Sequence, residues 1–282
     1  MGSDTLDIAA LRGWIGRESS ALDQITPELV RRHLATLAHF QPCDLGEGEA
    51  PPGIHWCLSP QVVPTPETGI DGHPRRGGFV PPVPLPFRMW SGSRLAFHEP
   101  LRIGDEVTRH SRIEQIEGKQ GRSGPLCFVT VAHRFITARG LAMTEDQGIV
   151  FRGPAPKGEA AKADSTQAPT GSRSGPFRCG SVDLFRFSAL TFNGHRIHYD
   201  RDHARTEGHP DLVVHGPLQA TLMLRRAVAE RGRLPARYEI RGLRPLYREE
   251  AFFLATRPAD GGLELAVEKE DGLPTMTARA RW

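Results

Sequence analysis

The chain has 282 residues, of which 38% are apolar, and its 36 basic and 33 acidic side chains give a formal net charge of +3. This length suits one large domain or two of ordinary size. The near balance of charge says little about partners, and no basic stripe with interleaved aromatic residues points to nucleic acid. The four Cys residues form no Cys-x-x-Cys pair and show no Cys/His zinc spacing, which favours reduced thiols over disulfides or structural zinc.

The segments that direct a protein to a compartment have no match in this chain. The first residues, Met-Gly-Ser-Asp-Thr-Leu-Asp-Ile, lack a basic region followed by an apolar core, so we expect no secretory signal. Their acidic character argues against a mitochondrial transit peptide. No apolar run approaches membrane-spanning length, so we expect a cytoplasmic location and no membrane partner.

The first half predicts one helix, one long loop and a pair of strands. Thr26 is a good N-cap with Pro27 at the first helical position, and apolar residues recur at helical spacing up to Leu37. Residues 41–86 stay irregular because they are rich in Pro and Gly, and loops this long are usually functional or disordered. Alternating runs at 109–116 and 126–137 surround a Gly-rich turn and predict antiparallel strands.

The second half repeats this organisation after a linker. Residues 153–176 hold no large apolar side chain and predict a mobile linker. Pro217 opens an apolar run that predicts a buried helix over 218–230. Alternating runs at 251–257 and 263–268 predict a strand pair, and the run at 275–281 predicts a last edge strand. A faint echo between 99–107 and 244–252, 145 residues apart, is compatible with a duplicated α+β domain.

Two short segments of the second half combine the side chains that acid–base chemistry needs. Residues 188–200, Ser-Ala-Leu-Thr-Phe-Asn-Gly-His-Arg-Ile-His-Tyr-Asp, hold an amide, two imidazoles, a guanidinium, a phenol and a carboxylate. A solvated loop is rarely so apolar and a core strand rarely so polar, so the mixture predicts a half-buried acid–base site. In residues 213–218, Val-Val-His-Gly-Pro-Leu, a glycine precedes the predicted helix, where its bare N–H can face a ligand oxygen.

The same segments carry a resemblance to a known family. They resemble the signature of the MaoC-like, or R-specific, hotdog enoyl-CoA hydratases, in which an Asp is followed by an Asn two places on and a His five places on. Asn193, His195 and His198 stand at these positions. The segments are more similar to a subgroup that includes fungal mitochondrial 3-hydroxyacyl-thioester dehydratases and bacterial mesaconyl-C4-CoA and itaconyl-CoA hydratases. Three N-terminal stretches are similar to the bacterial group as well: 14–18, 25–29 and 89–95.

The resemblance implies both a fold and an activity. The fold is an α+β double hotdog, in which two antiparallel sheets each wrap around one long helix. Residues 1–152 would form a non-catalytic half with the acyl pocket, 153–176 a flexible linker, and 177–282 the half with the catalytic motif. The activity is that of a hydratase (a carbon–oxygen lyase) adding water to an α,β-unsaturated acyl-CoA, namely itaconyl-CoA or mesaconyl-C4-CoA, to give citramalyl-CoA. The loop at 41–86 is then expected to line the acyl pocket.

This hydration needs a base for the water, a proton for the α carbon and a stabilised thioester oxygen. We expect His198 to be the base, Asn193 to orient water or substrate, and the Gly216 N–H to be the oxyanion donor. An amide cannot take a proton at physiological pH, so Asn193 leaves the identity of the acid open. The candidates for the acid are His195, Tyr199 and Asp200.

A substrate with a free carboxylate calls for a buried arginine in its pocket. Arg88, Arg94 and Arg196 are the candidates. The full set of expected substrate-binding residues is His195, Arg196, Tyr199, His215, Arg94, Trp90 and Arg88. Plainer interpretations stay open for several of them: an ion pair of Arg196 with Asp200, a turn or helix cap at Asp200, a structural or pocket-wall role for His215 and a core position for Trp90.

Beyond the acyl-CoA substrate, we expect no cofactor and no metal. No dinucleotide or Walker motif occurs, and the histidines at 195 and 198 have no third ligand at convincing spacing. The sequence leaves a homodimer open. Two alternative functions also stay open: a 3-hydroxyacyl-thioester dehydratase of straight-chain lipid synthesis, and a non-catalytic acyl-CoA-binding subunit in which Asn193 marks a lost acid.

Overall fold

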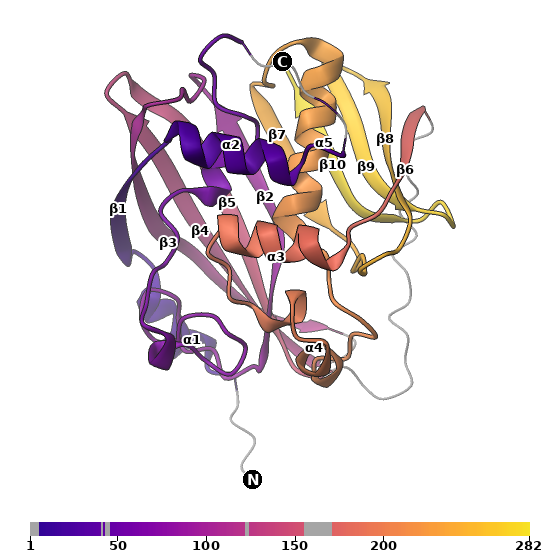
Figure 1. Ribbon diagram of the computed structural model, residues 1–282. Helices are drawn as coiled ribbons and strands as arrows, with labels where there is room; N and C mark the ends of the chain where they lie inside the picture. The colour runs from indigo at the N-terminus through magenta and orange to yellow at the C-terminus, as the bar shows by residue number, and fades with distance from the viewer. Residues whose placement is uncertain (1–5, 41, 43–45, 122–123, 155–170) are drawn as a thin grey trace.

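One curved antiparallel sheet of ten strands runs through the described part of the chain in the computed structural model (Figure 1). The structure describes residues 6–40, 42, 46–121, 124–154 and 171–282. The start of the chain, two residues of the predicted Gly-rich turn and most of the predicted linker lie outside these ranges. The sheet confirms the α+β class expected from the sequence.

The strand order is the same from either edge of the sheet: β1-β3-β4-β5-β2 meets β7-β10-β9-β8-β6 at the antiparallel pair of β2 and β7. The first-half strands are β1 (Glu18–Gln24), β2 (Phe87–Phe97), β3 (Glu106–Gly121), β4 (Gly124–Thr137) and β5 (Gly140–Arg152). The second-half strands are β6 (Ser172–Phe177), β7 (Arg237–Gly242), β8 (Phe252–Ala259), β9 (Gly262–Lys269) and β10 (Pro274–Arg281). This mirrored order is what two copies of one five-stranded unit produce when they join edge to edge.

The helices lie on the concave side of the sheet or at its lower end. The α-helices are α1 (Ile8–Leu11), α2 (Pro27–Thr36), α3 (Ser181–Leu190), α4 (Arg201–Thr206) and α5 (Gly216–Arg231). Short 3-10 turns are η1 (Arg12–Trp14), η2 (Ile54–Cys57), η3 (Thr65–Glu67) and η4 (Arg196–His198). The sequence predicted α2 and α5, and the Thr26 hydroxyl caps α2 as expected by accepting from the Leu29 N–H at 3.1 Å.

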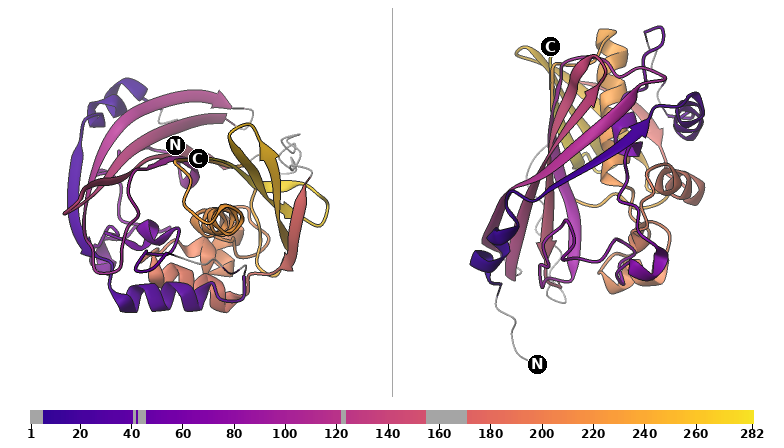
Figure 2. Two further views of the ribbon diagram at one scale, coloured as in Figure 1. Left: turned by 90° about the horizontal axis from the view of Figure 1, so that it is seen from above. Right: turned by 90° about the vertical axis from the view of Figure 1, so that its left-hand side faces the viewer.

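The long helix α5 lies inside the curve of the sheet, between the second-half strands and α3 (Figure 2). Ten of its residues are buried, from Leu218 to Val228, so it is covered on all sides rather than along one stripe. Its apolar side chains join those of β7 to β10 in the main core. The helix is therefore fixed along its length, and its first turn, at Gly216, is held in one place relative to the sheet.

Among its described residues, the first half has no long helix in the corresponding place. The segment before β2 is the predicted irregular loop, whose described residues form the short turns η2 and η3, whereas the segment before β7 is α5. The helix α2 has 10 residues and lies beside α3 across the open side of the sheet (Figures 1 and 2). The concave side of the first half is therefore available for a cavity.

The structure differs from the sequence prediction at the last strand and at the linker, and it leaves the described cysteines unpaired. The run at 275–281 forms β10, which is not an edge strand, because β7 and β9 pair with its two sides. The predicted linker ends earlier than residue 176, because Ser172 already pairs with Thr256 in the edge strand β6. Among the described cysteines, Cys57, Cys127 and Cys179 are unpaired and buried. No helix in the described ranges is long and apolar enough to span a membrane.

Candidate active site

His198 lies where the end of η4 meets the start of α5. Its side chain is buried, and its Nδ1 lies 2.7 Å from the Val213 carbonyl oxygen, to which it donates in the neutral ring. This bond directs the second nitrogen, Nε2, to be the one with a free lone pair. Burial lowers the pKa of His198 to about 3, so the ring is neutral at physiological pH and can accept a proton.

His215 lies directly behind His198. The two rings stack with centroids 3.6 Å apart, and the Nε2 atom of His215 lies 2.8 Å from the Ser188 hydroxyl oxygen. His215 is fully buried and is the N-cap residue of α5. It does not line the cavity, so its position favours the structural interpretation over a contact with substrate: its ring supports the ring of His198.

The tight turn that follows α3 positions Asn193 in the site. The helix stops at Thr191, Phe192 takes a left-handed conformation with φ of 49°, and the Asn193 N–H then donates to the Ser188 carbonyl at 2.9 Å. The side-chain oxygen of Asn193 accepts from the His195 N–H at 2.9 Å. The amide NH₂ is thus the part of Asn193 that can act on a molecule in the cavity.

Gly216 begins α5 and lines the same cavity. A Cβ at this position would lie 2.5 Å from the Trp90 ring, so only glycine fits with the indole in place. The N–H groups of the first turn have no partner within the helix and carry its positive dipole end. Gly216 therefore has the geometry expected of an oxyanion donor.

A second set of polar groups comes from the loop before β2. Gly72 packs so tightly on Gly194 that a Cβ would lie 1.9 Å from the Gly194 carbonyl oxygen, and the Arg196 N–H donates to the Asp71 carbonyl at 2.9 Å. These contacts place the His73 ring against that of His195, with centroids 4.3 Å apart. The loop was expected to line the acyl pocket, but no motif in it pointed to Asp71 or His73 as polar groups of the site.

Arg88 on β2 completes this set. Its Nε lies 3.5 Å from an Asp71 carboxylate oxygen, while Nε and Nη2 are buried without a hydrogen-bond partner. Burial lowers the pKa of Arg88 to about 10, so the guanidinium is still charged at neutral pH. A buried charge that is incompletely paired favours binding of an anion.

A buried carboxylate, that of Glu207, lies beside His195. Its Nε2 has no hydrogen-bond partner, and lies 3.5 Å from the Glu207 carboxylate, which is 3.0 Å from His203 Nε2. In the described ranges, Asp71, His73 and His195 bring one potential ligand atom each within 4.8 Å of one another. The expectation of no metal did not foresee this cluster; the Arg88 charge beside Asp71 opposes a cation there.

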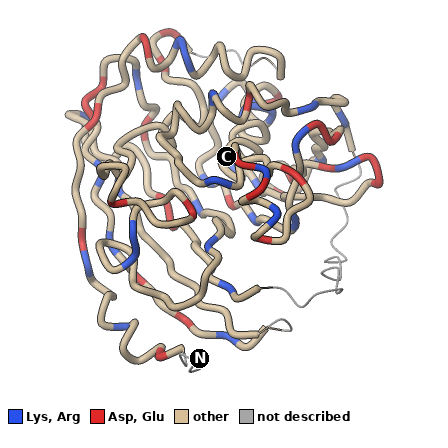
Figure 3. Tube along the Cα trace, turned by 60° about the horizontal axis from the view of Figure 1, so that its bottom comes forward, with Lys and Arg blue, Asp and Glu red and all other residues tan. Residues whose placement is uncertain are grey.

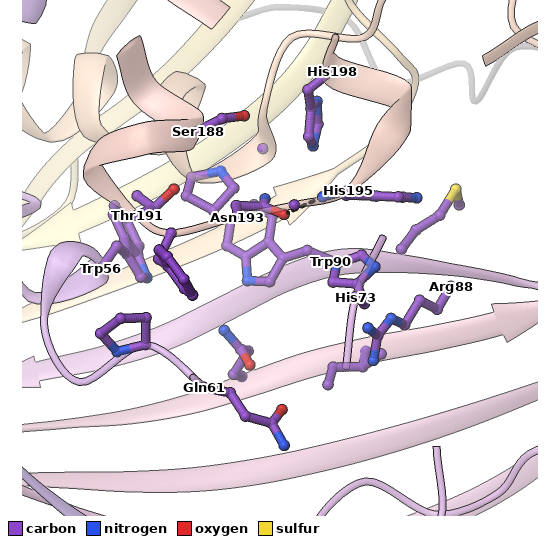
Figure 4. Close-up of a pocket in the computed structure, with 18 of the residues that line it drawn as sticks. Trp56, Gln61, His73, Arg88, Trp90, Ser188, Thr191, Asn193, His195 and His198 are labelled. Atoms are coloured by element: carbon purple, nitrogen blue, oxygen red, sulfur yellow. Dashed lines mark hydrogen bonds between the residues drawn. The ribbon is translucent and has the colours of Figure 1, made fainter. Parts of the chain in front are cut away.

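The side chains of Asn193, His195, His198, His73 and Arg88, together with Gly216, face one cavity of about 1600 Å³ (Figure 4). Its wall includes residues 59–63, 72–74, 79 and 80, so the predicted irregular loop lines it as expected. In Figure 4, Trp90 lies between Asn193 and the strands, with Trp56 on one side and His73 and Arg88 on the other. Trp90 is therefore a cavity residue rather than only a core residue.

Arg94 is the clearest correction to the predicted site. Its side chain is 70% exposed, forms an ion pair with Asp146 at 3.3 Å and does not line the cavity. Simple alternation would put residues 88, 90 and 94 on one face of β2. A β-bulge between Trp90 and Gly92 shifts the alternation, so that Ser93 and Leu95 turn inward and Arg94 turns outward.

Arg196 and Asp200 pair with each other, as one interpretation of the sequence held. The guanidinium donates to Asp200 at 2.7 and 3.1 Å and to the Ile70 carbonyl at 3.0 Å, away from the cavity. Asp200 also caps α4 by accepting from the His203 N–H. The guanidinium of Arg196 therefore points away from the cavity, contrary to the expected contact with substrate.

Tyr199 lines the cavity, and its hydroxyl donates to the Gly194 carbonyl at 3.0 Å.

Comparison with known proteins supports the resemblance seen in the motif. Residues 53–248 match the family model for hydroxyacyl-thioester dehydratase type 2. The mesaconyl-C(4)-CoA hydratase of Chloroflexus aurantiacus is 38% identical over 274 residues, which cover 94% of this chain and 95% of that protein. The mitochondrial hydroxyacyl-thioester dehydratase type 2 of Schizosaccharomyces pombe is 26% identical over 223 residues, covering 70% and 74%.

A solved structure supports the fold. A Mycobacterium tuberculosis protein described as having a double hotdog fold superposes with a TM-score of 0.59 at 13% identity, covering 94% of this chain and 95% of that one. The mirrored strand order and this likeness confirm the double hotdog expected from the sequence. The likeness bears on the fold alone, because the identity is low.

Proposed function

The chain belongs to the hydroxyacyl-thioester dehydratase type 2 family of MaoC-like hotdog hydratases and dehydratases, and we propose that it hydrates mesaconyl-C4-CoA or itaconyl-CoA to citramalyl-CoA. The observation that carries the hydration is His198, a neutral buried imidazole whose Nδ1 is occupied by a carbonyl and whose Nε2 is free. The 38% identical relative supports a branched dicarboxylic substrate.

For mesaconyl-C4-CoA, whose double bond is conjugated with the thioester, the proposed reaction adds one water across that double bond. His198 Nε2 takes a proton from a water oriented by the Asn193 amide, and the water oxygen bonds to the β carbon. The electron pair of the double bond moves toward the thioester oxygen, where the Gly216 N–H stabilises the developing enolate charge. The α carbon then takes up the proton that His198 holds, which returns His198 to its neutral form and restores the thioester. Asn193 thus orients the water and does not transfer a proton.

We assign the free carboxylate of the substrate to Arg88. In citramalyl-CoA this carboxylate stands on the carbon that receives the hydroxyl, so its partner must lie near the base. Arg88 is linked to the site through Asp71, His73 and His195, and two of its nitrogen atoms are unpartnered. Arg94 and Arg196, the other candidates, point out of the cavity.

The test compares two arginines on one strand and two substrates. Turnover of mesaconyl-C4-CoA and crotonyl-CoA is measured by chromatography for wild type, Arg88→Gln and Arg94→Ala. A charge-assisted hydrogen bond is worth about 1.5–3 kcal/mol, so Arg88→Gln should lower kcat/KM for mesaconyl-C4-CoA about 10- to 150-fold more than for crotonyl-CoA. Arg94→Ala should change neither. An equal loss on both substrates for Arg88→Gln would refute the assignment.

One observation favours the straight-chain dehydratase as the second candidate. The cavity, at about 1600 Å³, continues past the histidines into the first half, where a long acyl chain would need to go. Turnover of straight-chain enoyl thioesters without turnover of the C5 esters would support it, and binding without turnover would support the non-catalytic subunit. The cytoplasmic location, the homodimer and the lack of a cofactor stay predictions.

A further inference from the structure

Trp90 stands at the point where the reacting end of the cavity opens toward the first half. Its ring fills the space in front of Gly216, 2.5 Å from where a Cβ would be. Trp56 meets it edge to face, with ring centroids 6.3 Å apart and planes at 82°. An acyl chain that extends from the proposed oxyanion site into the first half must pass this pair of indoles (Figure 4).

A buried network holds the two indoles in place. The Trp90 N–H donates to the Ser93 hydroxyl at 3.2 Å, and that hydroxyl donates to the Glu145 carboxyl at 2.5 Å. The Trp56 N–H donates to the same Glu145 oxygen at 3.1 Å. Glu145 is 2% exposed, so turning Trp90 away would break a hydrogen bond in a buried site that water does not readily replace.

The cavity wall near this network is polar. Around Glu145 the cavity is lined by side chains that carry hydrogen-bonding groups: His55, Arg109, Ser111, His133 and Gln147. His133 is buried and bonds to the Ser111 hydroxyl at 2.8 Å. A long apolar chain in this space would cover polar groups without pairing them, at a cost in free energy. Steric and polar effects therefore both act against long acyl groups.

We propose that Trp90, positioned by Ser93 and Glu145, makes the protein prefer short acyl groups by narrowing the way from the reacting carbons into the polar part of the cavity. The inference rests on the proposed function, in which the acyl thioester reacts between His198 and Gly216. It assigns Trp90 as a specificity-determining residue, and Ser93 as a positioning residue that acts through it.

The first experiment measures chain-length preference. Initial rates with crotonyl-CoA (four carbons) and trans-2-octenoyl-CoA (eight carbons) give kcat/KM for wild type, Trp90→Leu and Ser93→Ala. Wild type should prefer the four-carbon ester at least about tenfold, since four further methylenes would have to pass the indoles and cover polar groups of the cavity wall. Trp90→Leu should raise the eight-to-four ratio at least tenfold, and Ser93→Ala should raise it less. Trp282→Leu is the matched control, because Trp282 lies outside this cavity and should leave the ratio unchanged.

The second experiment separates this inference from the proposed reaction. Calorimetric binding of butyryl-CoA and octanoyl-CoA needs no turnover, so it reports on the cavity even if no enoyl-CoA is hydrated. Wild type that binds both equally, or a Trp90→Leu ratio equal to the wild-type ratio, overturns the inference while the hydratase proposal still stands. If Trp90→Leu fails to fold, the shift in Ser93→Ala decides, and an unchanged ratio there counts against the proposal.

Discussion

The two halves of the molecule share a strand order and differ in what fills the curve of the sheet. In the second half the 16-residue helix α5 occupies the concave side, and in the first half a loop with short 3-10 turns borders a cavity. The helix brings its unpaired first-turn N–H groups to the centre of the molecule, next to the histidines. The loop leaves the space that a substrate needs. In the proposed function, one duplicated scaffold would supply the acid–base groups from one half and the substrate cavity from the other.

Both halves bury histidines, but in different surroundings. His195, His198 and His215 form a contiguous group around the start of α5. His33, His55 and His133 lie buried in the first half, near Arg109 or Arg225, and burial lowers the pKa of each to about 3. Charged Lys, Arg, Asp and Glu residues are spread over both halves and do not mark the difference (Figure 3). The following experiments test this division of roles.

The largest effect is expected at His198, the proposed base, in the second half. His198→Ala should lower kcat for crotonyl-CoA and mesaconyl-C4-CoA alike by about 10²- to 10⁴-fold, because it removes the base. His110→Ala, an exposed histidine on β3, is the matched control and should keep full activity. Steady-state kinetics on both substrates, with circular dichroism to check folding, make the comparison. A His198→Ala protein with more than a tenth of wild-type kcat would contradict the role.

The contact of Gly216 in the second half with Trp90 in the first half can be tested by adding a Cβ at Gly216. The Cβ in Gly216→Ala would overlap Trp90, and overpacking of this kind costs about 1–3 kcal/mol of folding free energy. Adding Trp90→Leu to the same chain should recover most of that loss, because the indole is the obstacle. Urea unfolding of the two single variants and the double variant gives the coupling energy. Strict additivity would show that Trp90 is not what requires the glycine.

The buried histidines predict an acid-sensitive fold. Their folded pKa near 3 lies below the unfolded value of about 6.5, so the unfolded chain binds more protons between these values. Stability should be fully present above pH 6.5 and fall as the pH drops toward 3. Each such histidine contributes up to about 1.4 kcal/mol per pH unit, so the measured slope near pH 5 should exceed that figure.

His33 isolates one of these contributions. Its ring is fully buried and neither ring nitrogen has a hydrogen-bond partner, so His33→Leu removes a titrating group with little loss of bonding. The slope of unfolding free energy against pH should decrease by up to about 1.4 kcal/mol per unit. Unfolding curves in denaturant at several pH values measure it, with His110→Leu as the exposed control. An unchanged slope for His33→Leu would argue against a neutral buried ring.

The smallest effect is expected in α2, far from the chemistry. Thr26→Ala removes the hydroxyl that accepts from the Leu29 N–H and should cost about 1 kcal/mol of stability. Because α2 only covers the open side of the sheet, kcat/KM should stay at its wild-type value. Ser20→Ala, an exposed position on β1, should change neither quantity and serves as the control. A drop in activity would mean that α2 takes part in shaping the cavity.

The sequence by itself determined the local features of this protein. Thr26-Pro27 predicted a helix start because the cap is a local hydrogen bond, and alternation predicted β3, β4, β8 and β9 because side chains of a strand alternate between faces. The helix α3 was missed, since its end carries the motif's polar residues and hides the apolar pattern. The order of residues 188–200 and 213–218 identified the family and His198.

Only the tertiary structure decided which distant groups meet. Asp71 and His73 lie far from His195 in the chain, and the contact of Gly72 with Gly194 brings them to it. Glu207, at the end of α4, approaches His195 because that helix folds back on the site. The choice of Arg88 over Arg94 depends on one β-bulge, which no alternation pattern shows in advance. The contact of Trp90 with Gly216 likewise depends on how two distant elements pack. Local hydrogen bonds and periodicity can be read from neighbouring residues, whereas a site between two halves depends on their packing.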